Sequence, residues 1–371
     1  MNLSYWEYKT WLSNIDFTVV GSGIVGLNCA LALKTKFPKA KILVLEKGLL
    51  PQGASTKNAG FACFGSISEI LADLKSHSEN EVVQLVKKRW EGIQLLRKTL
   101  GDENIGYLQY NGGHELFLEG HESQYQSCLN HLADVNKLLR PIFGEKIFLT
   151  HENSYEFKNV QKNYISNRFE AQIDTGKMMS KLIQFAQKSG IFILNSISVT
   201  EFTENSETVW VKTDQFEFQT KKLFVATNGF ASQLLKEIVT PARAQILITK
   251  PIENLHVKGT FHFDEGYYYF RNIDKRILFG GGRNLDMKAE ETTLLGETDL
   301  IQNQLEKILK ESILPNTSFE IERRWSGVMG IGNKKKPILK QVSENVFCGV
   351  RLGGMGIAIG SQIGKELADL L

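Results

Sequence analysis

The fold follows first from nine residues, VVGSGIVGL at positions 19–27. Their three glycines have the spacing G-x-G-x-x-G, which is typical of a strand-to-helix turn that holds the phosphates of a dinucleotide. Residues 17–20 before the turn are aromatic or β-branched, as a buried strand requires. Residues 24–37 after it repeat apolar side chains at helical spacing, and Pro38 ends the pattern. The turn therefore has the strand and the helix that its function needs.

A second strand and an acidic residue follow at the distance that a dinucleotide fold requires. Residues 41–48, KILVLEKG, contain a continuous apolar run, as expected of a parallel strand buried on both faces. Glu46 ends this run, twenty residues after Gly26. An acidic side chain at this point accepts hydrogen bonds from the adenosine ribose and disfavours a phosphorylated ribose. The sequence therefore predicts FAD or NAD rather than NADP.

The rest of the chain favours FAD over NAD. After Glu46 the regular strand–helix pattern gives way to a loop of small residues, 52–66, that suits close approach of backbone to a ligand. A later strand, 223–226, ends at a Thr-Asn-Gly turn, and the C-terminal strand is followed by a glycine-rich helix start at 353–356. The positive end of that helix would stabilise negative charge on a reduced flavin. Binding of NAD does not require a glycine-rich helix start at the C-terminal end of the chain.

Two segments interrupt this nucleotide fold. We expect an α/β protein with a Rossmann-like FAD-binding domain, at 1–82, 162–240 and 322–371, and a second α+β substrate-binding domain on a mostly antiparallel sheet, at 83–161 and 241–321. Helices are predicted at 81–100 and around 297–310, and residues 105–120 are strand-like.

The aromatic strand YYYF, residues 267–270, belongs to the second domain. Side chains alternate along a strand, so Tyr267 and Tyr269 face one way and Tyr268 and Phe270 the other. We expect one of these two faces to cover the flavin and the other to lie in the core.

Composition excludes several classes of protein. The net charge of +3 gives no strong field for nucleic acid, and no stretch approaches the about 18 apolar residues of a membrane span. The four cysteines form no C-x-x-C pair, and the seven histidines show no metal-binding spacing, so we expect no metal and no disulfide framework. The N-terminus has no signal-peptide pattern, and we expect a cytoplasmic protein.

Six segments, taken in chain order, resemble the D-amino acid oxidase-like flavoproteins, a superfamily that includes glycine oxidase, sarcosine oxidase and γ-glutamylputrescine oxidase. They are VVGSGIVGL with VLEKG, ASTKNAG, FVATNG, GYYYFRNIDKRILFGGG, RWSGVMGIG and the last glycine-rich helix. The aromatic segment and the ASTKNAG loop are most similar to the γ-glutamylputrescine oxidase branch.

The resemblance implies non-covalent FAD and a set of contacts. The cofactor-binding residues that it implies are Gly21, Ser22, Gly23, Ile24, Gly26, Glu46, Lys47, Ser55, Thr56, Asn58, Ala59, Gly60, Val199, Thr227, Asn228, Gly229, Arg351, Gly353, Gly354, Met355, Gly356 and Ile357. The catalytic residues that we predict are Tyr268 and Arg351, of which Arg351 matches an active-site arginine of glycine oxidase.

Two departures from the family limit the substrate. Met329 stands where glycine oxidase-like members place an arginine for the substrate carboxylate, and Leu278 stands where sarcosine oxidase-like members place an oxygen-activating lysine. We therefore favour an amine without an α-carboxylate, or with its acid at a distance, unless Arg351 or Arg243 takes over. The electron acceptor, oxygen or another molecule, stays open.

The predicted function is oxidative deamination of an amine or amino acid by hydride transfer to FAD. Two alternatives share the fold. One is the flavin domain of a tRNA-modifying enzyme, which usually has a basic groove and a fused methyltransferase domain. The other is a flavin-binding protein without amine oxidase activity.

Overall fold

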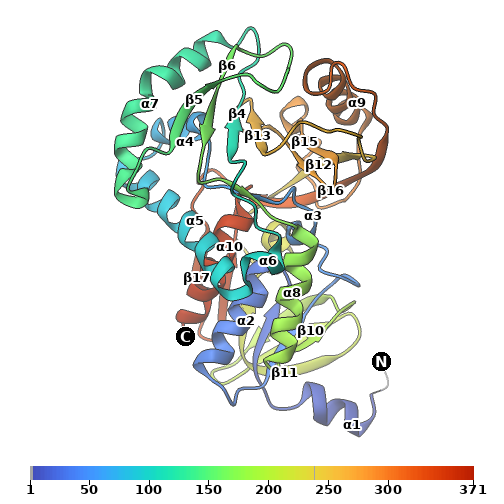
Figure 1. The fold of residues 1–371 in the computed structure, drawn as a ribbon. Helices are drawn as coiled ribbons and strands as arrows, with labels where there is room; N and C mark the ends of the chain where they lie inside the picture. The colour runs from blue at the N-terminus through green and yellow to red at the C-terminus, as the bar shows by residue number, and fades with distance from the viewer. Residues whose placement is uncertain (1–2, 238) are drawn as a thin grey trace.

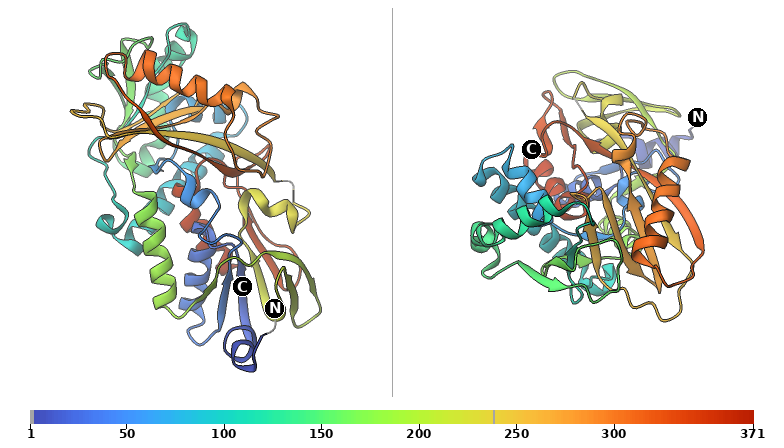
Figure 2. Two further views of the ribbon diagram at one scale, coloured as in Figure 1. Left: turned by 90° about the vertical axis from the view of Figure 1, so that its right-hand side faces the viewer. Right: turned by 90° about the horizontal axis from the view of Figure 1, so that it is seen from above.

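The structure is a computed structural model that describes residues 3–237 and 239–371. Figure 1 shows two sheets with their helices stacked one above the other, the N-terminus lying at the lower end. Figure 2 shows the same separation from the side. The chain passes between the two layers several times, so each is built from segments far apart in the sequence.

The first sheet has the order β17-β18-β11-β1-β2-β8, and β10 pairs with β11 while β9 pairs with β10. The pairings of β1 with β2 and β11, of β2 with β8 and of β11 with β18 are parallel. The strands are β1 Ile15–Val20, β2 Ile42–Leu45, β8 Phe192–Leu194, β9 Val199–Glu204, β10 Val209–Thr213, β11 Glu217–Val225, β17 Ile338–Gln341 and β18 Val346–Val350. The predicted Rossmann-like sheet is confirmed.

Helices α2 Ile24–Lys36, α5 Glu79–Leu100, α8 Thr175–Lys188 and α10 Gly356–Asp369 pack around one core with this sheet. The C-terminal helix α10 lies between α2 and α5 (Figure 1). Glycines permit this approach, because a Cβ at Gly92 of α5 would overlap the carbonyl oxygen of Ala358, and one at Gly360 would come within 2.8 Å of Ile24. This packing fixes the N-terminus of α10 beside that of α2.

The second sheet has the order β16-β12-β15-β14-β13-β4-β6-β5 and is antiparallel except for the pair β13–β4. The strands are β4 Gly113–Glu115, β5 Phe148–Glu152, β6 Asn163–Asn167, β12 Thr240–Thr249, β13 Thr260–Phe263, β14 Tyr268–Ile273, β15 Arg276–Gly281 and β16 Ile321–Ile331. The mostly antiparallel sheet is as predicted, and so are α5 and α9 Asp299–Ile308. Within the strand-like 105–120, the regular strand is shorter than expected.

Two helices cover the flanks of this half, α7 Glu122–Phe143 on one side and α9 on the other (Figure 1). The remaining elements are short: α1 Tyr5–Glu7, α3 Ala54–Lys57, α4 Ile67–Leu74, α6 Asp102–Ile105, β3 Phe61–Ala62, β7 Ala171–Gln172, η1 Tyr8–Leu12, η2 Asn228–Gln233, η3 Arg283–Leu285 and η4 Leu309–Ile313. Among the described residues, no helix combines the length and the apolar character needed to cross a bilayer.

Two of the expected domain boundaries need correction. Strands β6 and β16 were expected in the FAD-binding domain, yet both pair within the second sheet. Because β16 runs the full length of β12, residues 322–331 belong with the substrate half. The return to the first domain therefore begins after β6 and after β16.

Candidate FAD site and catalytic cavity

A cavity of about 960 Å³ lies between the two sheets and takes its lining from both. The first half contributes the glycine turn, the ends of β1 and β2 and the start of α10. The second half contributes residues of β12, β13, β14 and β16. Ligands of parallel sheets bind at the carboxyl ends of the strands, and this cavity opens at those ends.

The glycine turn has no room for side chains. Gly21 has a φ of +102°, and a Cβ there would stand 2.9 Å from the carbonyl oxygen of Ala226. A Cβ at Gly26 would overlap the carbonyl oxygen of Gly21, so only glycine lets α2 begin so close to β1. Gly23 is the N-cap of α2 and offers no capping side chain. The free backbone N–H groups of this helix start suit a phosphate.

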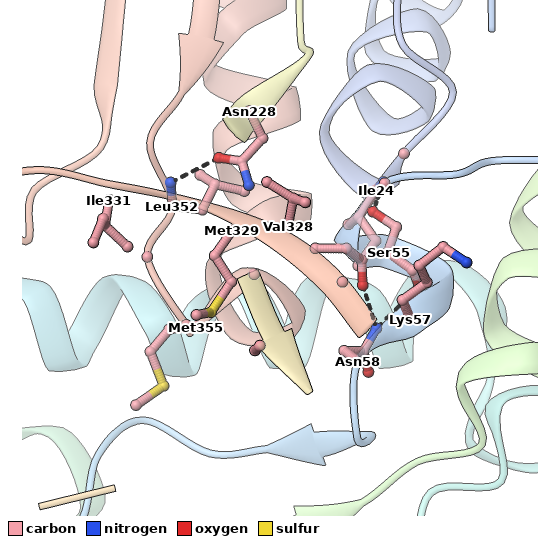
Figure 3. Close-up of a pocket in the computed structure, with 18 of the residues that line it drawn as sticks. Ile24, Ser55, Lys57, Asn58, Asn228, Val328, Met329, Ile331, Leu352 and Met355 are labelled. Carbon is pink, nitrogen blue, oxygen red and sulfur yellow. Dashed lines mark hydrogen bonds between the residues drawn. The ribbon is translucent and has the colours of Figure 1, made fainter. Parts of the chain in front are cut away.

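Ser55 reaches this helix start from the loop that follows β2. Its Oγ accepts a hydrogen bond from the backbone N–H of Ile24 at 3.0 Å (Figure 3). A polar hydroxyl is thereby held beside the α2 N-terminus, where it can also contact an anion.

Glu46 lies at the end of β2, buried but on the cavity wall. Oε2 accepts hydrogen bonds from the N–H and the hydroxyl of Ser22, at 3.0 and 2.7 Å, and Oε1 accepts one from the N–H of Gly48 at 3.0 Å. These bonds hold the carboxylate at the place where a dinucleotide fold presents its ribose acceptor.

The loop from Gly53 to Phe61, called the flavin loop below, lines the middle of the cavity. Asn58 organises it: Nδ2 donates to the carbonyls of Ala54 and Ser55, and Oδ1 accepts from the N–H of Gly60. The hydrogen bonds of the Asn58 side chain therefore stabilise the conformation of the loop backbone. The loop presents mainly main-chain groups and small side chains to a ligand.

The start of α10 closes the far side of the cavity. Gly353 has a φ of +62°, and the N–H of Leu352 donates to Oδ1 of Asn228 at 3.1 Å, which ties the loop to the end of β11 (Figure 3). Met329 and Met355 also line this part (Figure 3). Their thioethers make the wall apolar and polarizable.

This arrangement fits FAD. The helix start of α2 suits the pyrophosphate, Glu46 suits the ribose, and the second helix start at α10 provides N–H groups for the flavin ring. The glycines that remove side chains from the turn leave space that a Cβ would fill. The cavity continues beyond these elements to the second sheet, so a substrate has access to the same space.

One face of the second sheet covers the cavity. Strand register aligns His262, Tyr269, Gly280, Ile246 and Trp325 as directly opposed residues across five strands. A Cβ at Gly280 would lie 2.7 Å from the ring of Tyr269, so the glycine makes room for that ring. Of this row, His262, Tyr269 and Ile246 line the cavity and form its cover on this side.

The alternation predicted for the aromatic strand is observed, and it places Tyr268, the predicted catalytic residue, on the face that is turned away from the cavity. Tyr267 and Tyr269 line the cavity. Tyr268 belongs to the core of the second half, where its ring stacks on Phe263 at 4.9 Å. The catalytic assignment followed the strand without deciding which of its faces meets the cavity.

Arg351 is also displaced from its predicted role. It has a φ of +62°, and its Nη2 donates to the carbonyl oxygen of Lys336 at 3.0 Å. Its side chain lies against Gly332 and does not line the cavity. The guanidinium is therefore held outside the cavity, which a motif match does not reveal.

The other predicted residues separate into two groups. The cavity is lined by Gly21, Gly23, Ile24, Glu46, Lys47, Ser55, Asn58, Ala59, Gly60, Val199, Thr227, Asn228, Gly353, Gly354, Met355, Gly356 and Ile357. Ser22, Gly26, Thr56 and Gly229 stand behind this wall and support it, Thr56 through a hydrogen bond from Oγ1 to the carbonyl of Pro51 at 2.5 Å.

A buried ion pair, not singled out from the sequence, meets the cavity beside Tyr269. His262 lines the cavity, and its Nε2 lies 2.5 Å from Oε1 of Glu170. Burial lowers the pKa of an imidazole, but the Glu170 carboxylate outweighs it and raises the pKa of His262 to about 9. The ring of Phe61 packs edge-on against that of His262 at 5.0 Å.

Cys63 adds a third potential metal ligand, since its Sγ and the ligand atoms of Glu170 and His262 lie within 4.8 Å of one another. Two donors bound tetrahedrally at about 2.0 Å to one zinc ion would be about 3.3 Å apart. The 2.5 Å contact of Glu170 with His262 is shorter than this, so the two side chains form a hydrogen-bonded ion pair and not a preformed pair of zinc ligands. Burial also raises the pKa of the Cys63 thiol well above its usual range.

The arginines near the cavity differ in how they are paired. Arg243 makes a two-point ion pair with Glu290, at 2.8 and 2.7 Å, so it is not available to a substrate. Arg283 lines the cavity and contacts Sδ of Met287 and the ring face of Tyr267. Among the described residues it has no carboxylate partner. Sequence patterns did not identify it, because η3 carries no motif.

Comparison with known proteins agrees with this geometry. A family model described as "FAD dependent oxidoreductase" matches residues 16–370. A probable oxidoreductase, OrdL, from Haemophilus influenzae is 21% identical and the match covers 98% of this chain and 84% of that protein. A D-amino acid dehydrogenase from Helicobacter pylori J99 is 23% identical over 96% of this chain and 94% of its own length.

Solved structures share the fold. Glycine oxidase from Geobacillus kaustophilus superposes with a TM-score of 0.77 at 17% identity, covering 96% of this chain and 94% of that one. L-proline dehydrogenase from P. horikoshii gives a TM-score of 0.72 at 18% identity, covering 96% and 93%. At these identities the likeness establishes the arrangement of the chain.

Proposed function

Because this chain belongs to the family of FAD-dependent oxidoreductases, we propose that it oxidises an amine or amino acid by hydride transfer to FAD. The product is an imine, which water hydrolyses to a carbonyl compound and a free amine or ammonia. The observation that carries the proposal is the continuity of one cavity from the dinucleotide turn to the aromatic cover. A cofactor and a small substrate can meet only in such a shared space.

The chemistry asks the protein mainly for position and for exclusion of water. FAD, when bound, accepts the hydride. Tyr269, Ile246 and Met329 provide an apolar surface that orients the substrate and favours the uncharged amine, because an ammonium group is costly to desolvate.

Arg283 replaces Arg351 and Arg243 as the proposed grip for an acidic substrate. It is a cavity arginine without a carboxylate partner among the described residues, and a guanidinium binds carboxylates through two parallel hydrogen bonds. Met329, which also lines the cavity, stands in the sequence where an amino-acid oxidase would place its arginine for the substrate carboxylate. We therefore favour a substrate whose acid group lies away from the reacting carbon.

The test is anaerobic reduction of the bound flavin. Purified protein loaded with FAD is mixed without oxygen with a panel of amines, acidic amines and α-amino acids, and the visible flavin absorbance is followed. Rapid bleaching by an amine supports the proposal. Absence of bleaching across the panel, with dithionite still reducing the flavin, would favour a flavin-binding protein without amine oxidase activity.

Two finer properties belong to the same proposal. FAD is held without a covalent bond, so acid precipitation should release the yellow colour into the supernatant, and a yellow pellet would contradict this. The electron acceptor is identified by reoxidation: oxygen and an artificial dye are added in turn to the reduced protein. Apolar Leu278 packs against Ala59 and Ile246 and provides no cation for oxygen activation.

A further inference from the structure

The flavin loop, Gly53–Phe61, receives two hydrogen bonds from side chains of the other sheet. Nη1 of Arg271, on β14, donates to the carbonyl oxygen of Gly60 at 2.8 Å. Nε1 of Trp325, on β16, donates to the carbonyl oxygen of Lys57 at 3.0 Å. The two bonds hold the loop at positions three residues apart.

We propose that Arg271 and Trp325 are positioning residues for FAD, through which the substrate-side sheet fixes the conformation of the flavin loop. Neither side chain lines the cavity, so each acts through the backbone carbonyl that it binds. The assignment depends on the FAD site and not on the identity of the substrate.

Arg271 is buried, with 3% of its surface exposed, and no carboxylate contacts it among the described residues. Nη1 also donates to the carbonyl of Ile173 at 2.7 Å, where the chain enters α8. Burial lowers its pKa to about 10 and leaves it charged at neutral pH, with Asp174 and Asp274 opposing that shift. Burying an arginine is costly, so two carbonyls from the other domain are its compensation.

The bond of Arg271 fixes which way one peptide of the loop points. Gly60 has a φ of +76°, and its carbonyl oxygen also accepts a hydrogen bond from the N–H of Ile173 at 2.9 Å. With both lone pairs of that oxygen occupied inside the protein, the Gly60–Phe61 peptide is held in one orientation. Ala59, Gly60 and Phe61 all line the cavity, so this orientation sets the wall of the proposed FAD site.

Trp325 acts at the other end of the loop, where β16 approaches it closely. A Cβ at Gly327 would lie 3.0 Å from Cβ of Lys57, so the glycine lets the strand and the helical turn α3 come together. Trp325 lies opposite Ile246 in the row that also contains Tyr269, and it packs against the apolar cluster of Ala59, Ile246 and Leu278. Its indole therefore links the cover of the cavity to the backbone of the flavin loop.

The consequence is that the substrate-side sheet completes the FAD site. A loop rich in small residues has many conformations when free. The entropy lost in ordering it weakens FAD binding unless other contacts order the loop before FAD binds. Arg271 and Trp325 supply that order from β14 and β16, on which the cavity cover is also built.

The experiment uses four full-length variants. Trp325→Phe removes the indole donor and keeps an aromatic ring; Arg271→Lys keeps a charge with a different geometry. The matched controls are Trp210→Phe on β10 and Arg276→Lys on β15, neither of which reaches the loop. The dissociation constant of FAD is measured with apoprotein by flavin fluorescence, and visible circular dichroism is recorded at saturating FAD.

We expect FAD to bind about fivefold more weakly to Trp325→Phe and roughly tenfold to a hundredfold more weakly to Arg271→Lys, since one lost bond is neutral and the other charged. The visible circular dichroism should change in both, because the flavin environment changes. A purely structural role would lower the melting temperature of apoprotein and leave the spectrum of the saturated protein unchanged. If either folded variant binds FAD like the controls with a native spectrum, the proposal is overturned.

Discussion

The two sheets that enclose the cavity contribute to it in opposite ways. The first sheet presents backbone: glycines at the turn, a loop of small residues and two helix starts. The second presents side chains, among them Tyr267, Tyr269 and Arg283. A site made of backbone groups can be predicted from the spacing of residues in the local sequence. A site made of side chains depends on which face of a strand is buried and on the register of the neighbouring strands.

The largest effect is expected where a side chain is added to the backbone site. Gly26→Ala places a Cβ on the carbonyl oxygen of Gly21, so the turn must open and we expect more than a hundredfold loss of FAD affinity. Flavin content after purification is the measurement. Gly176→Ala, in the first turn of α8, is the control, and flavin-replete Gly26→Ala protein would mean that the turn is not built as described.

The next effect concerns the acidic residue of the same half. Glu46→Ala removes the ribose acceptor and leaves the donors of Ser22 and Gly48 without their partner. Each bond to a charged acceptor contributes about 1.5–3 kcal/mol, so FAD should bind at least tenfold more weakly. Titration of apoprotein with FAD measures this, and native affinity would show that β2 does not meet the ribose.

The two neighbouring tyrosines test the side-chain half. Tyr269→Leu should lower the rate constant of flavin reduction about tenfold with little change in stability. Tyr268→Leu should lower the free energy of unfolding by about 2–3 kcal/mol, because it removes a buried ring from the core, with a near-native reduction rate. The reverse outcome would restore Tyr268 as the residue that meets the substrate.

Arg283 and Arg351 test whether an observed position in the cavity or a match to a family motif identifies the arginine that binds the substrate. Arg283→Ala should reduce kcat/KM for an acidic amine roughly tenfold to a hundredfold and affect a neutral amine much less. Arg351→Ala should stay within about twofold for both, since its guanidinium binds the carbonyl of Lys336. Equal losses for acidic and neutral amines in Arg283→Ala would argue against a carboxylate grip.

The stability of the protein should also depend on pH. The pKa of His262 is raised to about 9, so its contribution is complete below the unfolded value of about 6.5 and is lost as the pH rises through 9. That contribution is at most about 3 kcal/mol. Buried Glu115, whose pKa burial raises to about 7, weakens stability over the lower window from about 4.5 to 7.

The melting temperature of the FAD-loaded protein, recorded from pH 6.5 to 9.5, should therefore fall. In His262→Gln the fall between pH 7 and 9 should disappear, while the change below pH 7 stays. A native slope above pH 7 in that variant would assign the titration to another group.

Sequence reasoning reached the first half of the molecule more fully than the second. The turn at Gly21–Gly26, Glu46 and the start of α10 follow from spacing, because the positions of backbone groups are set by local conformation. The sequence did not distinguish Tyr268 from Tyr269, because the alternation of side chains along a strand defines two faces without indicating which one meets the cavity. Arg283, His262 and Arg271 carry no local pattern, and their roles arise from strand register and from partners that are distant in the chain.

The central claim is that a substrate in this cavity loses a hydride to FAD, and isotopic substitution tests it most directly. An amine that bleaches the flavin is prepared with deuterium on the carbon that bears nitrogen, and the rate constant of anaerobic flavin reduction is measured by stopped flow at saturating amine. We expect reduction to be several-fold slower with the deuterated amine, because that C–H bond breaks in the step observed. Equal rate constants for the two amines in a step shown to be limited by reduction would contradict it.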